Sequence, residues 1–365
     1  MAETVWNIPR RIPYLDGLRA FSIATVVLGH CKLFIPWFQT RAAIPVDLIA
    51  NGRLGVRVFF VISGFLITTL LLKEMEKTGK ISLSGFYERR IARIFPAFYT
   101  YIITIAVLAF FHVLDIRWQD LVTGATFTWN YGSLWNAGTT ASGQVMGHLW
   151  TISLEEQFYL LWPACLILLG KRWAARFAVA CVCLLPLVRL ASYFLIPSTR
   201  GQIMGMFHTG ADTILWGVVG AFAWQRGAVD RISRLKYRAA LPWLSALVAF
   251  GLCPLLEARI RGANVVITPS LECASVMLFI FWLISGSGGV VRKALDSWPL
   301  VQLGLLSYSL YLWQELFILC ERLYFIPLAV RVLCALVAAF VSYRFIEIPL
   351  RNRIRLWFSQ SQPAH

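Results

Sequence analysis

The apolar segment at residues 15–37 carries ionisable side chains that could perform acid–base chemistry. It is long enough to cross a bilayer, yet it contains Asp16, Arg19 and His30, and charged groups inside a membrane usually face a protein interior or a wet cavity. A helix would place Arg19 and His30 on one face with a rise of about 16 Å between them. The arginine could hold the anionic end of a long, thin molecule whose reactive end reaches the histidine. A snorkelling arginine and a core histidine would explain the same pattern.

Two adjacent carboxylates interrupt a later apolar run, in the sequence SLEEQ. Glu155 and Glu156 are costly in such a run, and counting the rise along each helix places Glu155 and His30 in the outer half of the membrane. A histidine paired with a carboxylate gains basicity and a defined tautomer. We therefore take His30, Glu155 and Glu156 as candidate catalytic residues. The alternative for the carboxylates is a structural ion pair with Arg57 or Arg189.

The sequence FYERRIARIFPAFY offers a candidate site for an anion. Arg90 and Arg93 are three residues apart and share a face if the segment is helical, whereas Arg89 points elsewhere. Two guanidinium groups on one face suit bidentate phosphate binding. An ordinary cluster of positive charge at the cytoplasmic end of a span is the alternative.

The polar and aromatic stretch at residues 112–147 could bind a sugar, because aromatic rings stack on sugars and amide groups hydrogen-bond their hydroxyls. An aromatic belt at the membrane interface would explain the same composition. His148 follows this stretch directly, and Asp212 is expected near the outer end of a later span. Glu347, which lies among arginines, is interpreted as structural. The predicted substrate-binding residues are Asp16, Trp129, Asn130, His148 and Asp212.

The composition excludes an ordinary soluble protein. Of the 365 residues, 58% are hydrophobic and 14% are charged, and the mean hydropathy of +0.67 is typical of a polytopic membrane protein. Apolar spans with short loops use nearly the whole chain, so we predict an all-α integral membrane bundle of about ten transmembrane helices. One membrane domain at residues 14–350 is expected between cytoplasmic segments at residues 1–13 and 351–365. The expected spans are residues 14–36, 55–72, 94–112, 149–170, 177–196, 209–225, 240–257, 271–285, 301–320 and 327–345.

The net charge of +16 is distributed in a way that argues against a nucleic-acid partner. Most of the 34 Lys and Arg residues fall in alternate segments between the spans, which places both termini in the cytoplasm and favours contact with anionic membrane lipids. The eight cysteines lie in apolar runs without ligand spacing. We therefore expect free thiols, no disulfide framework and no metal site.

Six segments together resemble the membrane-bound acyltransferase 3 family: LDGLRAFSIATVVLGH, GVRVFFVISGFLIT, FYERRIARIFP, HLWTISLEEQFYLLWP, SYSLYLW and RFIEIPLR. They follow the family's order and extend from about residue 13 to 352. The resemblance implies transfer of an acyl group, often acetyl, from a cytoplasmic coenzyme A thioester to a hydroxyl of a carbohydrate or glycolipid. Some relatives carry an additional extracytoplasmic domain, so this membrane domain is expected to act alone or to pass its acyl group to a partner.

The resemblance also implies roles for individual residues. Arg19 and His30 match the family's arginine-then-histidine pattern in the first span. Arg90 and Arg93 match its RxxR pattern, which is associated with the acyl donor, so Arg19, Arg90 and Arg93 are the predicted contacts to acyl-CoA.

Glu155 and Glu156 match the SLEEQ segment of the family, and one position departs from its pattern. The family often has a histidine after SYSLYLW, where this chain has Gln314, so no proton-handling role is carried over to that position. The predicted function is acyl transfer, most often of acetyl, in a bacterial inner or plasma membrane, with His30 as base or transient acyl carrier. A multi-span transporter or flippase of a glycolipid or anionic metabolite is the alternative, because buried charges also line permeation paths.

Overall fold

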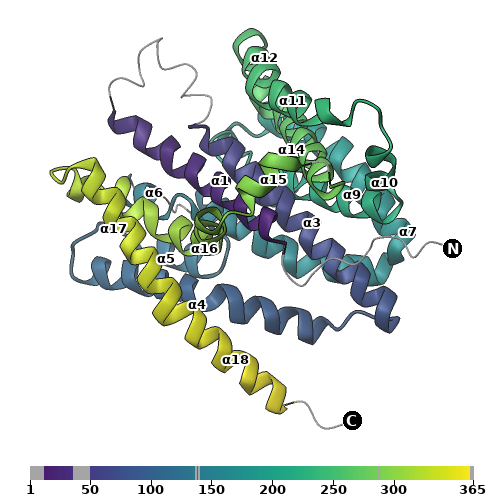
Figure 1. The fold of residues 1–365 in the computed structure, drawn as a ribbon. Helices are drawn as coiled ribbons and strands as arrows, with labels where there is room; N and C mark the ends of the chain where they lie inside the picture. The colour runs from purple at the N-terminus through teal and green to yellow at the C-terminus, as the bar shows by residue number, and fades with distance from the viewer. Residues whose placement is uncertain (1–11, 36–49, 136–137, 139, 287, 362–365) are drawn as a thin grey trace. The chain divides into compact units, whose positions relative to one another are not determined.

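The computed structural model describes residues 12–35, 50–135, 138, 140–286 and 288–361 (Figure 1). Every regular element in these ranges is helical and none is a strand, so the predicted all-α class is confirmed. The chain divides into two compact units. Unit 1 consists of Met1–Lys77, Cys165–Met204 and His208–Leu305, and unit 2 consists of Thr78–Ala164, Gly205–Phe207 and Leu306–His365.

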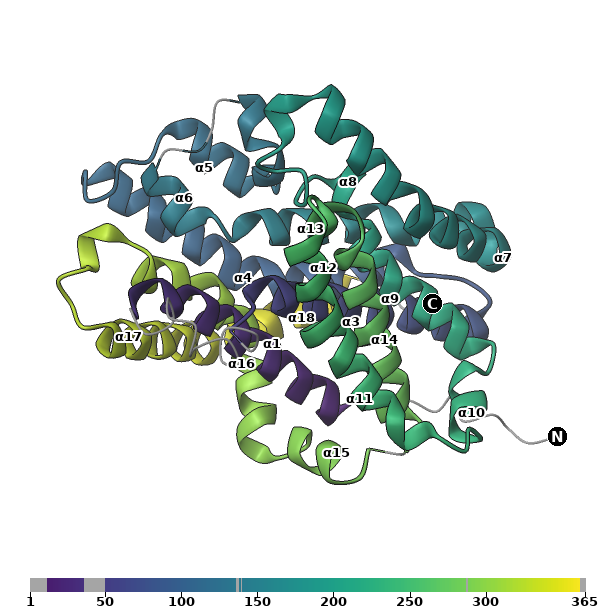
Figure 2. The same cartoon turned by 90° about the horizontal axis from the view of Figure 1, so that it is seen from above.

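Unit 1 contains the first two long helices of the chain and most of the shorter ones. Within it, α9 and α11 both pack against α14 (Figure 2). In chain order its elements are α1 (Pro13–Cys31), η1 (Lys32–Phe34), α3 (Gly52–Thr78), the second part of α7 (Leu149–Leu195), η5 (Pro197–Thr199), most of α8 (Phe207–Gly210), α9 (Asp212–Gln225), α10 (Ala228–Ser233), η6 (Arg238–Ala240), α11 (Leu241–Ala246), η7 (Leu247–Leu252), α12 (Cys253–Arg259), α13 (Ala263–Val266), α14 (Thr268–Ile284), α15 (Gly289–Leu295) and the start of α16 (Trp298–Ile318).

Glycines allow the helices of unit 1 to approach one another closely. A Cβ atom added to Gly64 of α3 would lie 2.1 Å from the carbonyl oxygen of Ile214, and one added to Gly217 of α9 would lie 2.1 Å from that of Val61. Gly55 of α3 packs in the same way against the α1 backbone. Only glycine fits such backbone contacts, as small residues do at other membrane helix interfaces. Gly55 and Gly64, which lie in the segment GVRVFFVISGFLIT, therefore serve helix packing.

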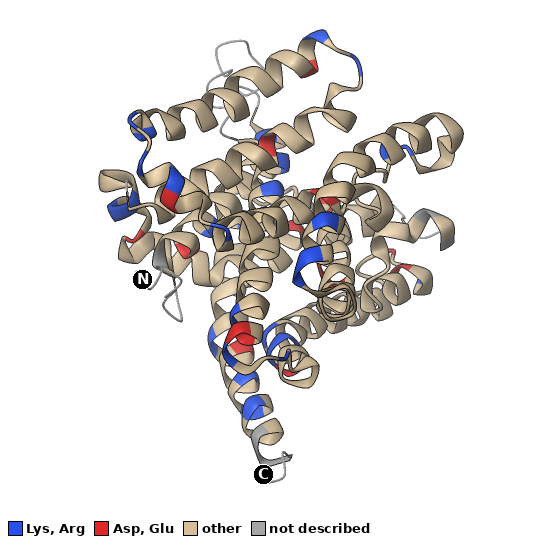
Figure 3. Ribbon diagram, turned by 90° about the vertical axis from the view of Figure 1, so that its right-hand side faces the viewer, with Lys and Arg blue, Asp and Glu red and all other residues tan. Residues whose placement is uncertain are grey.

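Unit 2 is organised by α4, which contacts both η9 and α18. Ser82 caps α4, because its Oγ accepts a hydrogen bond from the backbone N–H of Gly85 (3.2 Å). Arginines recur along α18, the helix that leads to the end marked C in Figure 3. The elements are α4 (Leu83–Phe110), α5 (Trp118–Ala125), η4 (Trp129–Trp135), α6 (Thr140–Met146), the first part of α7, most of α16, η8 (Glu321–Leu323), α17 (Leu328–Val341), η9 (Ser342–Glu347) and α18 (Ile348–Ser361).

Six helices among the described residues are long and apolar enough to cross a membrane, and a bent pair formed by α14 and α15 would make a seventh. The chain is thus a multi-pass membrane protein, whereas ten spans and cytoplasmic termini stay predictions. Some expected spans correspond to short helices: α9 has only 14 residues, which is below the ~20 residues that a straight crossing needs. Two expected spans share α7, whose backbone breaks at Gly170 (φ 67°), the last residue of the first predicted range.

Candidate functional site

The RxxR and SLEEQ motifs meet within unit 2. The guanidinium carbon of Arg90 lies 4.5 Å from the centroid of the Tyr159 ring, a distance at which a cation and an aromatic face attract each other. The Tyr159 hydroxyl donates a short hydrogen bond to Oε1 of Glu155. Arg90 also interacts electrostatically with both Glu155 and Glu156. Two motifs that were interpreted separately from the sequence therefore form one arginine–tyrosine–carboxylate cluster.

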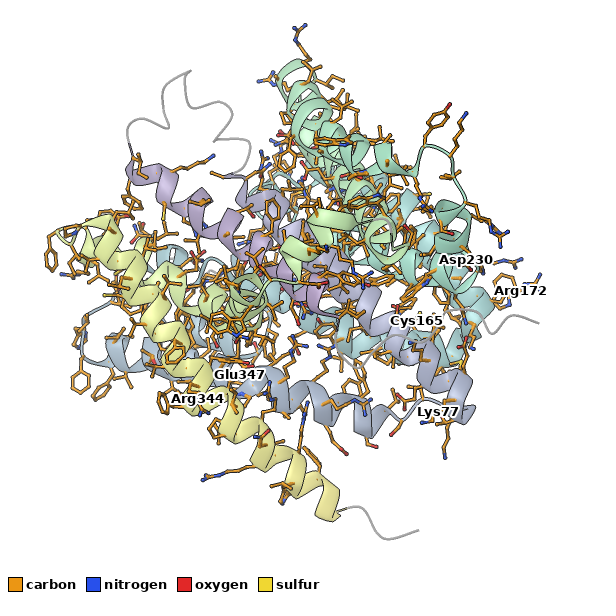
Figure 4. The ribbon with its side chains drawn as sticks, viewed as in Figure 1. Lys77, Cys165, Arg172, Asp230, Arg344 and Glu347 are labelled. Carbon is orange, nitrogen blue, oxygen red and sulfur yellow. The ribbon has the colours of Figure 1, made fainter. Side chains whose placement is uncertain are left out.

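The SYSLYLW and RFIEIPLR motifs lie in the same unit and extend this polar region. Tyr308 interacts electrostatically with Arg93, Glu156 and Glu347. Glu347 (Figure 4) is buried, accepts a hydrogen bond from Ser309 (3.1 Å) and lies 3.7 Å from the guanidinium group of Arg351. These contacts join η9, α16 and α18, which agrees with the structural interpretation of Glu347.

Four arginines gather where α4 packs against α18. Arg355 lies within electrostatic reach of Arg351 on its own helix and of Arg89 and Arg93 on α4. We call Arg89, Arg93, Arg351 and Arg355 the guanidinium cluster. Like charges held this close repel one another, so the arrangement favours binding of a polyanion. Of this set, only Arg93 was predicted from the sequence as a donor contact, because Arg351 and Arg355 belong to the expected cytoplasmic segment at residues 351–365.

The first-span residues lie on α1 in unit 1. Arg19 and Asp16 form an ion pair at 3.6 Å, and His30 lies in the last turn of α1 with its side chain partly exposed. The carboxylates proposed to orient His30 belong to unit 2. The pairing of His30 with Glu155 or Glu156 stays a prediction.

The two arginines that were considered as alternative partners for the SLEEQ carboxylates have other partners in unit 1. Arg57 of α3 donates to Glu272 of α14, and both are buried. Arg189 of α7 forms a two-pronged pair with Asp212 of α9, with N–O distances of 2.9 and 3.0 Å, and both side chains are fully buried. This geometry gives Asp212 a structural partner, and its predicted contact with substrate stays a prediction.

The aromatic and amide residues expected to bind sugar are buried in unit 2. The amide groups of Asn130 and Gln157 exchange two hydrogen bonds of 3.0 Å, and Asn130 also donates to the carbonyl of Gly205. Trp129 is 8% exposed. The amide of Asn130 is thus occupied in fastening η4 to α7, and the predicted sugar contacts of Trp129 and Asn130 stay untested predictions.

His148 forms a histidine–carboxylate pair that the sequence analysis missed. Its Nδ1 lies 2.8 Å from Oε2 of Glu315 on α16, and its backbone N–H donates to the same oxygen (3.0 Å). The rings of Tyr101 and Tyr311 pack edge-on to the imidazole, each with a centroid distance of 5.4 Å. Tyr311 and Glu315 are four residues apart on one face of α16. That spacing was visible in the sequence, but nothing there linked it to His148.

Each unit contains a cavity. The cavity in unit 2 has a volume of about 390 Å³ and a polar wall, whereas the cavity in unit 1, between α1, α3, α11 and α14, has about 270 Å³ and an apolar wall. No group of three His, Cys, Asp or Glu side chains with metal-binding geometry occurs among the described residues. The residues around the polar cavity are Leu114, Asp115, Thr140, Ala141, Gln144, Val145, Cys320, Glu321 and Arg322.

Comparisons with known proteins match nearly the whole chain. A family model described as an acyltransferase domain matches residues 12–343. The O-acetyltransferase OatA of Staphylococcus aureus (strain NCTC 8325 / PS 47) is 30% identical over 366 residues, which cover 94% of this chain and 58% of the relative. The OatA of strain COL matches equally well. The chain thus spans about 58% of the length of these curated relatives. No solved structure is a significant match.

Proposed function

Because this chain belongs to the acyltransferase 3 family, we propose that it is a membrane O-acetyltransferase. It moves an acyl group, most often acetyl, from acyl-CoA on the cytoplasmic side to a hydroxyl of a carbohydrate or glycolipid. Its similarity to O-acetyltransferases supports transfer of an acetyl group to oxygen. The observation that carries the proposal is the meeting of Arg90, Tyr159 and Glu155 in unit 2, because it joins the donor-associated motif to the paired carboxylates.

We assign binding of the acyl-CoA donor to the guanidinium cluster. Coenzyme A carries several phosphates, and arginines bind phosphate bidentately. Arg93 belongs to both the RxxR motif and this cluster. The positive charge of Arg90 is already neutralised in part by Glu155 and Glu156. Arg93 therefore contributes more to phosphate binding, and Arg90 contributes more to holding the carboxylates in place. Arg19, the remaining arginine that was predicted from the sequence to contact acyl-CoA, is proposed as a further donor contact.

The chemistry requires one proton to leave the acceptor and one to reach coenzyme A. The acceptor oxygen attacks the acyl carbon, the thioester C–S bond breaks, and the hydroxyl proton ends on the departing sulfur. His30 acts in this scheme as base or as transient acyl carrier. Glu155 or Glu156 orients it, as the sequence analysis proposed.

The decisive experiment is turnover of acetyl-CoA by purified protein in detergent, followed as free CoA release with a cell-envelope glycan extract as acceptor. Wild type should release CoA and acetylate the glycan, and His30→Ala should bind CoA without either reaction. Equal CoA release by both proteins would make His30 structural. No release by wild type, together with movement of an unmodified glycolipid across vesicles, would replace the proposal with a flippase.

Two arginines of α18 provide a test of the proposed acyl-CoA binding and its matched control. Arg355→Ala should raise the KM for acetyl-CoA several-fold and leave kcat nearly unchanged, because it removes binding that ground state and transition state share. Arg353→Ala removes an exposed arginine of α18 that lies outside the guanidinium cluster. Equal effects of the two substitutions would mean that α18 acts only through its overall charge.

A further inference from the structure

The apolar cavity of about 270 Å³ lies wholly within unit 1, because all the residues that line it belong to that unit. Two serines take part in its wall, but neither hydroxyl presents polar surface to the cavity. The hydroxyl of Ser275 donates to the carbonyl of Glu272 on its own helix (2.8 Å), and the hydroxyl of Ser245 is buried. Water gains no hydrogen bonds from such a wall. The cavity therefore suits an apolar molecule.

One wall of the cavity is a stripe along α11 and η7. The stripe residues recur at intervals of three and four positions and so share one helical face: Pro242, Ser245, Ala246, Ala249 and Phe250. Serine and alanine side chains are small, so they leave the hollow that larger side chains would fill. The helix rises by roughly 12 Å from the first of these residues to the last. A hollow of this length and of so small a volume suits a single alkyl chain.

The cavity reaches the surface of unit 1 at the end where α11 begins. Glu257 at the end of α12 accepts a hydrogen bond from Thr268 at the start of α14 (2.6 Å), so α14 runs back along α12 and α11. The end of α14, and α15 after it, therefore lie near the start of α11, and α15 also packs against α1 (Figure 2). Val291 of α15 lines the cavity and is exposed. A chain from the surrounding lipid can enter here.

Exposed tryptophans beside this opening indicate the level of the lipid headgroups. Trp243 directly follows Pro242 of the wall, and Trp298 lies three residues beyond Leu295 of the wall. Both tryptophans are exposed. Tryptophan is enriched where the hydrocarbon core of a bilayer meets its headgroups. An alkyl chain in the cavity would thus have its headgroup beside α11 and α15.

Basic residues gather at the same two places. Arg292 contacts the ring of Tyr14 (4.8 Å) and lies 3.7 Å from Asp296. The other basic residues form no ion pair with a carboxylate among the residues that the structure describes: Arg234, Lys236 and Arg238 before α11, and Lys293 on α15. All four are exposed. Each cation near a membrane surface favours an anionic headgroup, so this excess of positive charge selects among lipids.

We propose that unit 1 binds one anionic phospholipid, with an acyl chain in the apolar cavity and the phosphate among the basic residues beside its opening. The apolar wall selects the chain, and the charge beside it selects the headgroup. No step of the proposed acyl transfer uses the residues of this site. The two proposals therefore stand or fall separately.

The test is lipid binding to the full chain, purified and delipidated in a non-ionic detergent and measured by native mass spectrometry. The probes are phosphatidylglycerol and phosphatidylcholine with the same acyl chains. Wild type should bind one phosphatidylglycerol about tenfold more tightly than phosphatidylcholine, because only the former has a net negative charge. Ala249→Leu should weaken the binding of both lipids about tenfold, because its added carbons displace part of the chain from the cavity.

Matched substitutions separate the site from general effects. Ala180→Leu makes the same change at an exposed position of α7 and should bind both lipids as wild type does. Replacing Lys236 and Lys293 together by Gln should remove the preference for phosphatidylglycerol. Replacing Lys77 and Lys80 together by Gln, which removes the same charge from exposed positions elsewhere, should leave that preference unchanged. All variants should keep the wild-type peak in gel filtration.

Four results would overturn the proposal. Lipid binding by Ala249→Leu at the wild-type level would show that the chain lies elsewhere. Equal affinity of wild type for the two lipids would show that the headgroup charge is not recognised. Displacement of the lipid by glycerol phosphate at similar concentrations would identify a site for free phosphate. Its displacement by palmitoyl-CoA, one molecule for one, would assign the cavity to the chain of an acyl donor.

Discussion

Replacing Asp212 by asparagine should destabilise unit 1 rather than weaken substrate binding. Arg189 donates to Oδ1 and Oδ2 of Asp212 and to the carbonyl of Thr209, at 2.9, 3.0 and 2.7 Å. Asparagine retains one acceptor oxygen but turns an N–H donor toward the second arm of the guanidinium group. One of the three hydrogen bonds is thus lost, and the charge of Arg189 stays buried without a counter-charge.

The expected cost follows from burial, because both side chains are fully buried. Removing one partner of a buried ion pair costs about 3–5 kcal/mol. For a folded unit of this size, that corresponds to a thermal midpoint lower by about 6 °C or more. The double substitution Arg189→Met with Asp212→Leu should recover much of the loss, because it removes both charges together.

The measurement is the apparent unfolding midpoint in detergent, followed by tryptophan fluorescence at one scan rate for all variants. The KM for acceptor is measured on the same preparations. A wild-type midpoint for Asp212→Asn, combined with a raised KM, would refute this reasoning. It would return Asp212 to the substrate-binding role that its position near the outer end of a span predicts.

Three further perturbations test the packing and the cluster. Gly217→Val should prevent correct folding, because a Cβ atom at this position would lie 2.1 Å from the carbonyl oxygen of Val61. The expected readout is loss of the monodisperse peak in gel filtration. Gly143→Ala should fold normally, because a Cβ atom there meets nothing within 4 Å. Tyr159→Phe removes the hydrogen bond to Glu155 but keeps a ring beneath Arg90, and it should lower kcat about tenfold or less. Tyr159→Leu also removes the cation–π contact and should in addition raise the KM for acetyl-CoA. Glu272→Gln should lower the thermal midpoint as Asp212→Asn does, because it too breaks a buried ion pair.

Features that depend on neighbours along the chain were predictable from the sequence. The apolar runs around residues 14–36, 55–72 and 94–112 correspond to α1, α3 and α4, because a helix satisfies its own backbone groups wherever the environment is apolar. Gly55 and Gly64 of the segment GVRVFFVISGFLIT are small residues of the kind that permits close helix approach, and both provide it. The number of spans was less predictable, since α9 stays too short for a straight crossing.

Features that depend on distant partners were not predictable in the same way. The sequence places Arg189 and Asp212 within expected spans, but only the structure shows that they form a buried pair between α7 and α9. Likewise, Glu315 directly follows Gln314 in the sequence, yet its partner His148 lies 167 residues away. Periodicity reports which face of a helix is apolar, and it carries no information on which other helix covers that face.

The two units differ in how their buried charges are arranged. This difference supports the proposal that unit 2 binds the acyl donor. In unit 1, Arg57 and Arg189 each form an ion pair with a buried carboxylate, which neutralises the buried charge. In unit 2, Arg90 has two carboxylates near it, while the guanidinium cluster assembles like charges on α4 and α18. Glu347 lies 3.7 Å from Arg351 and offsets part of this positive charge, which leaves more arginines than carboxylates in the cluster. These excess charges become favourable when a polyanion lies against the arginines and a proton-transferring group lies near the carboxylates, which is the arrangement that an acyl-CoA-dependent transferase requires.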